Sequence, residues 1–111
     1  MAHTYSIVKS WVDKSRPGVH CGYVNITMAD DASADPASTY SIDAEDVNPN
    51  CSTLYQLTPI SGVVGTDDDR YELDWSYANQ YWTIYDADTG SPSTDVDILD
   101  GAVIYCYYEG A

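Results

Sequence analysis

Apolar and polar residues alternate along several short stretches of the chain, which is the pattern of half-buried β-strands. The clearest stretch is 70–77, where Tyr71, Leu73, Trp75 and Tyr77 alternate with polar neighbours. A period of two places successive side chains on opposite faces of a sheet. Further extended stretches are less regular: 5–12, 19–28, 39–42, 52–58, 80–85, 96–99 and 102–108. We therefore predict an all-β fold, a small antiparallel β-sandwich or barrel of about seven short strands.

Turn residues separate these stretches and indicate which of them pair. Pro17-Gly18 lies between the first two, and Asp100-Gly101 lies between 96–99 and 102–108. Because Asp-Gly favours the positive φ angles of a type I′ turn, we expect these last two stretches to form a hairpin. The second arm, 102–108, is apolar on both faces, which is typical of a central strand or of a strand at an interface.

The chain has the length of one domain, and we expect residues 1–111 to form a single β-rich domain. Its longest loop region is predicted at 29–50, where Asp, Ala, Ser and Pro predominate. A short extended stretch at 39–42 interrupts it, and 44–47 has the composition of at most one helical turn. Loops of this length are usually functional or are ordered by a partner.

The composition indicates a thin, aromatic core. There is no Phe, and Ile, Leu and Val together make up 20 of the 111 residues, a share that borders on that of disordered chains. Eleven Tyr and three Trp argue for a folded domain, because each aromatic ring can bury a large area. Such a domain gains from burying one face against a neighbour, and interfaces favour Tyr and Trp.

Charge is distributed unevenly along the chain. The net charge is −14, and most of the acids are Asp, which favours long acidic loops. Three of the four bases, Lys9, Lys14 and Arg16, lie in the first 16 residues, and only Arg70 follows. This surface argues against binding of nucleic acid, which needs clustered Lys and Arg. It is compatible with a basic partner or with a saline habitat.

Targeting signals and cysteines restrict the cellular context. The N-terminus has no apolar run of a signal peptide, and no segment reaches the roughly 18 apolar residues that cross a membrane. We therefore expect synthesis in a cytoplasm and no membrane partner. The three cysteines, Cys21, Cys51 and Cys106, lack a C-x-x-C spacing, so buried free thiols are expected, with one disulfide as the alternative.

No stretch of the sequence carries a strong signature of catalysis or of metal binding. His20 and Cys21 are adjacent in an extended stretch and should point to opposite faces, which disfavours nucleophilic catalysis. Asp86 and Asp88, with Asp97 further on, resemble a calcium loop, but its glycine comes one place early and strands flank it. Solvated turn acids are the alternative for these three. We expect no enzyme activity, no cofactor and no metal.

The chain resembles the small acidic β-rich decoration, or cement, proteins of tailed-bacteriophage capsids. Length, acidity, the missing signal peptide, Tyr and Trp richness and a strand-forming C-terminus at 101–108 carry this resemblance. It implies a virion protein that binds the outer surface of the capsid and stabilises the shell, often as a trimer. The implied partners are the major capsid protein, other virion subunits and further copies of the chain.

The docking segment is predicted from the charges. Residues 1–16, as an arm or a strand, would meet an acidic partner without repulsion through four residues, Lys9, Trp11, Lys14 and Arg16. We add Tyr105 and Tyr107 from the two-faced C-terminal strand. The alternatives are a tail or head-fibre component and a carbohydrate or adhesion module. A carbohydrate module requires that Trp75 or Trp82 be exposed, whereas the alternation around Trp75 favours the core.

Overall fold

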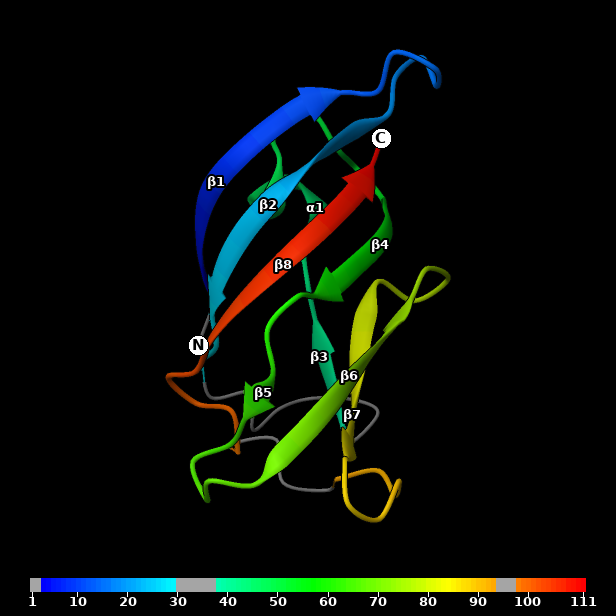
Figure 1. Ribbon diagram of the computed structural model, residues 1–111. Coiled ribbons are helices and arrows are strands. Elements are labelled where there is room, and N and C mark those ends of the chain that lie inside the picture. Colours follow the sequence, from blue (N-terminus) through cyan, green and yellow to red (C-terminus); the bar gives the residue numbers. More distant parts are fainter. Residues whose placement is uncertain (1–2, 30–37, 94–97) are drawn as a thin grey trace.

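The protein is a sandwich of two antiparallel four-stranded sheets. The computed structural model describes residues 3–29, 38–93 and 98–111 (Figure 1). The first sheet has the order β1-β2-β8-β4 and the second has the order β3-β7-β6-β5. The elements are β1 (Thr4–Val12), β2 (His20–Thr27), β3 (Thr39–Ser41), α1 (Ala44–Val47), β4 (Leu54–Pro59), β5 (Val63–Val64), β6 (Arg70–Ser76), β7 (Tyr81–Asp86) and β8 (Val103–Gly110). The predicted all-β sandwich is confirmed, with eight strands among the described residues.

Strand β8 is apolar on both faces because it is central. It pairs with β2 on one side and with β4 on the other, with Tyr23 opposite Tyr107 and Val24 opposite Cys106. Paired residues share a face, so Val24 and Cys106 point into the core, and both are fully buried. Tyr23 and Tyr107 point to the outer face. The N- and C-terminal strands therefore lie in one sheet, separated only by β2.

A β-bulge in β1 changes which of its residues share a face. Ile7 lies opposite Val24 and Lys9 lies opposite Tyr23, so Val8 is an extra residue in the ladder. From the strict alternation one would place Tyr5, Ile7, Lys9 and Trp11 on one face. That interpretation is wrong, because the extra residue Val8 shifts the alternation by one position, so the residues after the bulge face the opposite side from the one expected. Tyr5 and Ile7 point inward, whereas Lys9 and Trp11 lie on the outer face.

The predicted hairpin of 96–99 with 102–108 is wrong in its first arm. Ile98 and Leu99 form a turn, and 96–97 lie outside the described residues. Both turn residues are buried, and the backbone of Gly101 donates to the Met28 carbonyl at 2.8 Å. The turn therefore closes the core beside the end of β2. β8 pairs with β2 and β4 and not with residues 98–99. Apolar periodicity alone does not distinguish a buried turn from a strand.

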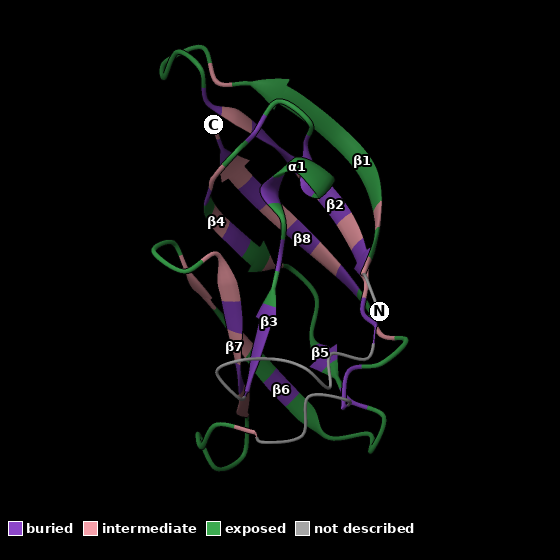
Figure 2. Ribbon diagram, turned by 180° about the vertical axis from the view of Figure 1, so that it is seen from behind, coloured by how far each residue is buried: buried purple, intermediate pink, exposed green. Residues whose placement is uncertain are grey.

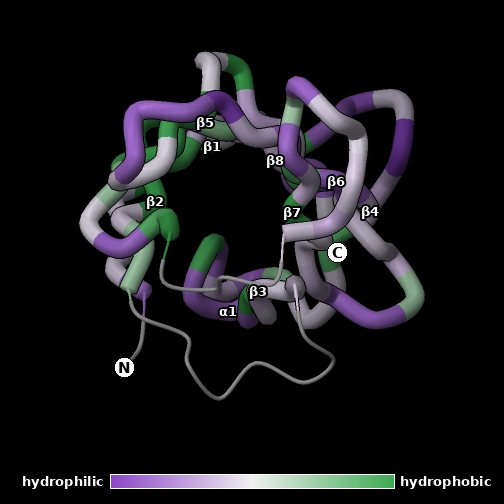
Figure 3. Tube along the Cα trace, turned by 90° about the horizontal axis from the view of Figure 1, so that it is seen from below, coloured by the Kyte–Doolittle hydropathy of each residue, from purple (hydrophilic) through white to green (hydrophobic). Residues whose placement is uncertain are grey.

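The core is built around aromatic rings. Tyr40, Trp82 and Tyr108 are among the largest fully buried side chains. Their polar atoms have partners: Trp82 Nε1 donates to the Leu57 carbonyl at 2.8 Å, and Asn48 Nδ2 donates to the Tyr108 hydroxyl at 3.0 Å. In the described residues no buried side-chain N or O atom lacks a hydrogen bond. Seen from below, the strands and α1 surround this interior, and hydrophilic residues occupy the outer loops (Figure 3).

Gln80 links the two sheets at one end of the sandwich. Its backbone is left-handed, with a φ of 56°, and its side chain accepts from the Leu54 amide at 2.8 Å and donates to the Leu54 carbonyl at 2.9 Å. Trp75 Nε1 donates to the same carbonyl at 3.1 Å and packs against Trp82. Trp75 is half-buried and Trp82 is fully buried, so neither ring is the exposed tryptophan that a carbohydrate module requires.

The predicted loop region at 29–50 contains two short elements in its described part. β3 pairs with β7 and α1 occupies 44–47, at the stretches where the sequence indicated an extended segment and a helical turn. Asp43 caps α1 by accepting from the Glu45 amide at 3.1 Å. No helix in the described part of the chain is long and apolar enough to cross a membrane.

Candidate docking face

Four aromatic side chains lie together on the outer face of the first sheet. They are Trp11 from β1, Tyr23 from β2, and Tyr105 and Tyr107 from β8, and we call them the aromatic face. Alternation in β2 and β8 puts Val24, Ile104 and Cys106 into the core, so the residues between them point outward. The three strands adjoin one another, and the rings therefore form one continuous patch.

The rings of the aromatic face contact one another. The ring centroids lie 5.7 Å apart for Trp11 and Tyr23, and 5.6 Å apart for Tyr23 with each of Tyr105 and Tyr107. The Lys9 ammonium lies 5.8 Å from the Trp11 ring centroid, within reach of a cation–π interaction. Because each ring restricts its neighbours, the four rings form a largely pre-organised surface.

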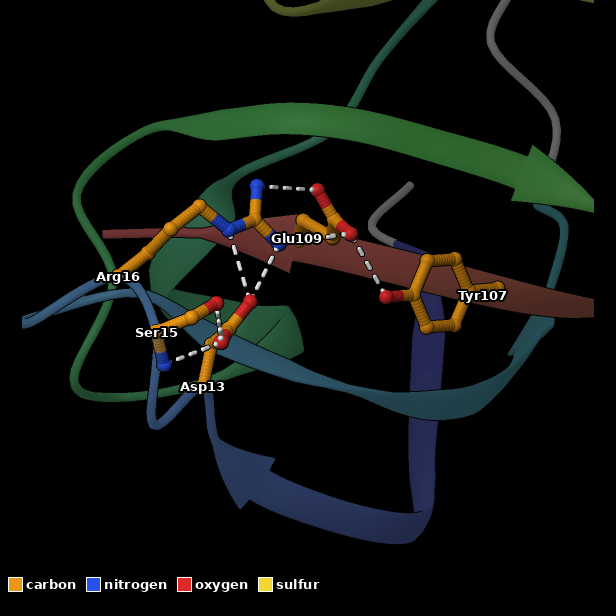
Figure 4. Close-up of polar contacts among 5 residues, drawn as sticks. All are labelled: Asp13, Ser15, Arg16, Tyr107 and Glu109. Atoms are coloured by element: carbon orange, nitrogen blue, oxygen red, sulfur yellow. Dashed lines mark hydrogen bonds and ion pairs between the residues drawn. The ribbon is translucent and has the colours of Figure 1, made fainter.

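Arg16 fixes the β1–β2 turn to β8 at one end of the aromatic face (Figure 4). Its guanidinium forms ion pairs with Asp13 at 2.7 Å and with Glu109 at 3.0 Å. The Tyr107 hydroxyl donates to Glu109 at 2.8 Å, and Ser15 donates to Asp13 through its amide and its hydroxyl. The network holds the Tyr107 ring in place from its polar end.

The same contacts shift the pKa values of the acids. Hydrogen bonds from Ser15 and then from Arg16 lower the pKa of Asp13 to about 2. Hydrogen bonds from Arg16 and then from Tyr107 lower the pKa of Glu109. Burial, followed by the bond to Glu109, raises the pKa of Tyr107. At neutral pH both carboxylates are therefore ionised, and the Tyr107 phenol keeps its proton.

The lowered pKa values predict how stability changes with acid. Because the folded pKa values of Asp13 and Glu109 lie below their unfolded values, this stabilisation is present above about pH 4.5 and is lost as the pH falls toward 2. We expect Arg16→Gln to lower the melting temperature most near pH 6, with the difference from wild type vanishing near pH 2.

The control for this prediction is Lys14→Gln, which removes the same charge from the same turn. The measurement is thermal unfolding followed by circular dichroism across this pH range. A deficit of Arg16→Gln that is independent of pH, or an equal deficit for Lys14→Gln, would contradict the role of the ion pairs.

The structure brings together most of the residues predicted for docking. Lys9, Trp11, Tyr105 and Tyr107 share the outer face, and Arg16 borders it with its charge engaged by two carboxylates. Lys14 lies beyond the end of β1, exposed in the β1–β2 turn. The segment 1–16 contains an integral strand, because β1 pairs with β2 along its whole length.

Sequence reasoning missed Tyr23, which is the centre of the patch. Its ring contacts Trp11, Tyr105 and Tyr107. The alternation of Val24, Ile26 and Met28 already placed Tyr23 on the opposite face of its strand. The missing information was the neighbouring strand, because only the β2–β8 register puts Tyr23 directly opposite Tyr107.

The acidic turn at residues 86–90 is held together by hydrogen bonds within the turn itself. Asp86 accepts from the amides of Asp88 at 2.8 Å and of Thr89 at 3.3 Å, which is how Asp stabilises a turn. Asp97, the third weak candidate for a calcium ligand, lies outside the described residues. Among the residues that are described, no group of three or more His, Cys, Asp or Glu side chains is arranged to hold a metal ion.

The cysteines are free and buried, as predicted. Cys21, Cys51 and Cys106 form no disulfide, and none is more than 2% exposed. Burial raises the pKa of the Cys106 thiol to about 12 and also raises the pKa of Cys51. These two thiols therefore stay protonated and act as small apolar side chains in the core.

An open pocket of about 520 Å³ lies between α1 and the first part of β1, and His3, Tyr5, Asp43 and Asp46 are in its lining. Burial, together with the charges of Asp46 and Asp43, raises the pKa of Tyr5, so its phenol stays protonated. Asp43 already serves as the cap of α1. Beside this pocket, α1 packs against β1.

Comparison with known proteins gives no relative. No family model matches the chain, and no curated protein or solved structure is significantly similar to it.

Proposed function

We propose that the protein is a structural virion subunit that decorates a tailed-phage capsid and stabilises the shell. The observation that carries the proposal is the aromatic face. Four contacting rings with a cation beside them lie on one side of a molecule whose net charge is −14. A pre-organised Tyr and Trp patch is the usual centre of a protein interface.

Charge supports the orientation of this docking. Lys9 lies on the same strand as Trp11, and Lys14 lies in the turn that follows this strand. Residues 17–111, in contrast, contain 17 acids and one base. An acidic partner surface would therefore attract this side of the molecule and repel the rest. The proposed partners are the major capsid protein or other virion subunits. The acidic loops then face solvent.

The aromatic face also supports a second candidate function. Each of the four rings packs against at least one other, and Trp11 is the most open of the three tryptophans, with 38% of its surface exposed. Exposed rings can also stack on sugars, which keeps a carbohydrate or adhesion module as the second candidate.

The test is co-sedimentation of the purified protein with capsids of the virus that carries its gene. We expect saturable binding, and we expect Trp11→Ala to raise the dissociation constant at least about tenfold, as for an aromatic residue at the centre of an interface. The matched control is Tyr77→Ala. Tyr77 is 56% exposed and its ring contacts that of Tyr55, away from the aromatic face.

Binding of wild type and Tyr77→Ala with loss of binding by Trp11→Ala supports the proposal. Equal binding by all three would contradict the role of the face. No binding to capsids, combined with quenching of tryptophan fluorescence by polysaccharide, would replace the proposal with the carbohydrate module.

A further inference from the structure

β1 is a long strand at an open edge of the sandwich. It spans Thr4–Val12 and ends the first sheet, with β2 as its strand neighbour. The other described edges are protected: β3 and β5 have three and two residues, and β4 contacts β6 and ends at Pro59. Natural proteins shorten or cover their edge strands because an open edge pairs with another chain.

The side chains of β1 leave this edge accessible and apolar. Figure 2 shows the strand exposed over nearly its whole length, while β2 and β8 alternate between buried and half-buried. Ile7, Val8 and Val12 are 46%, 53% and 54% exposed. Lys9 is its only charged residue. The bulge at Val8 and the charge of Lys9 protect the strand in part, and α1 contacts it, yet most of its residues stay exposed.

The hydrogen-bond pattern shows which backbone groups face the edge. The Asp13 amide donates to the Val19 carbonyl at 2.9 Å, and the pairs Trp11 with Cys21 and Lys9 with Tyr23 continue the same register. In an antiparallel ladder, residues alternate between bonding to the neighbour and pointing away from it. The amides and carbonyls of Ser10 and Val12 therefore point outward.

Opposite charges lie at the two ends of β1. Asp43, the N-cap of α1, and Asp46, within α1, line the same pocket as Tyr5 of β1. At the other end, Arg16 pairs with Asp13 and Glu109, and Lys14 in the same turn forms no ion pair with the described residues. If two β1 strands pair antiparallel, each Lys14 comes beside the acids of the other copy. Parallel pairing would instead place like charges together.

We propose that two copies of the protein pair antiparallel through β1, forming a two-fold symmetric dimer with one continuous sheet. Outward amides and carbonyls bond across the axis, and Ile7, Val8 and Val12 pack against the second copy. An isologous contact of this kind closes at two copies, in contrast to the trimer that the resemblance implies. The aromatic faces of both copies then lie on the same side. The pairing does not depend on capsid binding, so its test is separate.

The first experiment is the solution mass of the full chain by sedimentation equilibrium, at low and high salt. We expect a dimer, stronger at high salt because salt screens the net repulsion between two acidic molecules. Ser10→Pro removes an outward amide twice per dimer and should raise the dissociation constant at least about tenfold. Ser10→Ala keeps the amide and should dimerise like wild type.

A charge exchange tests the orientation without touching the strand. We expect Lys14→Glu to weaken the dimer, because it places an acid beside Asp43 and Asp46 of the second copy. Asp46→Lys combined with Lys14→Glu should restore it. Circular dichroism of each variant checks that the fold is retained.

A monomer at every concentration and salt would overturn the proposal. So would a trimer, a dimer that folded Ser10→Pro leaves unchanged, or a charge exchange that fails to restore the affinity.

Discussion

Trp82→Ala is expected to lower the free energy of unfolding by about 3–5 kcal/mol, the largest effect of any single truncation in this core. Trp82 lies in β7, is fully buried, and touches both sheets through its packing with Trp75 and its 2.8 Å hydrogen bond to Leu57. Truncation leaves a cavity and an unpaired carbonyl. The whole chain has only 20 Ile, Leu and Val residues and several of them are exposed, so the core has little apolar volume with which to fill the cavity.

Urea unfolding followed by far-ultraviolet circular dichroism measures this loss. The control is Trp11→Ala, which removes the same side chain from the exposed aromatic face and should cost no more than about 1 kcal/mol. Comparable losses for the two variants would show that the arrangement of core and outer face described above is wrong.

Gly22→Ala is expected to lower the free energy of unfolding by about 3 kcal/mol, because no methyl group fits at this place in β2. A Cβ atom there would collide with the Lys9 carbonyl and lie 2.8 Å from the Tyr108 ring and hydroxyl. The Tyr108 hydroxyl also accepts from Asn48, so moving the ring breaks a buried hydrogen bond. Either β1 leaves β2 or Tyr108 leaves the core.

The matched control for Gly22→Ala is Gly62→Ala. A Cβ atom at Gly62 meets nothing within 4 Å, so this variant should stay within about 0.5 kcal/mol of wild type. Thermal and urea unfolding of both variants is the measurement. Wild-type stability of Gly22→Ala would show that β1 and Tyr108 are not packed closely on β2.

The fold was predictable where one face of a strand is buried and the other is exposed to solvent. The alternation of Tyr71, Leu73 and Trp75 located β6 to within one residue. The pattern failed at Ile98 and Leu99, which are apolar because their turn closes the core. It failed again at Val8, because a bulge adds a residue without any mark in the composition.

The docking face was predictable in part. Charge asymmetry indicated the segment with Lys9 and Trp11, and the two-faced strand indicated Tyr105 and Tyr107. Tyr23 and the engagement of Arg16 by Glu109 depend on pairings between distant parts of the chain. Such pairings follow from strand order, which a single sequence does not contain.

Together, these features suggest one arrangement on a particle. In the proposed arrangement the aromatic face would meet the shell, the open edge of β1 would meet a second copy, and the acidic loops of the second sheet would face solvent. The buried rings of Trp82, Tyr40 and Tyr108 lie in the core between the two sheets.

The most direct test of the proposed function is an electron cryomicroscopy map of virions of a tailed phage whose genome is found to encode this chain. We predict density for the sandwich on the outside of the capsid, with Trp11, Tyr23 and Tyr107 toward the shell. Virions that lack the protein, or density in which the second sheet contacts the shell and the aromatic face points to solvent, would contradict the account.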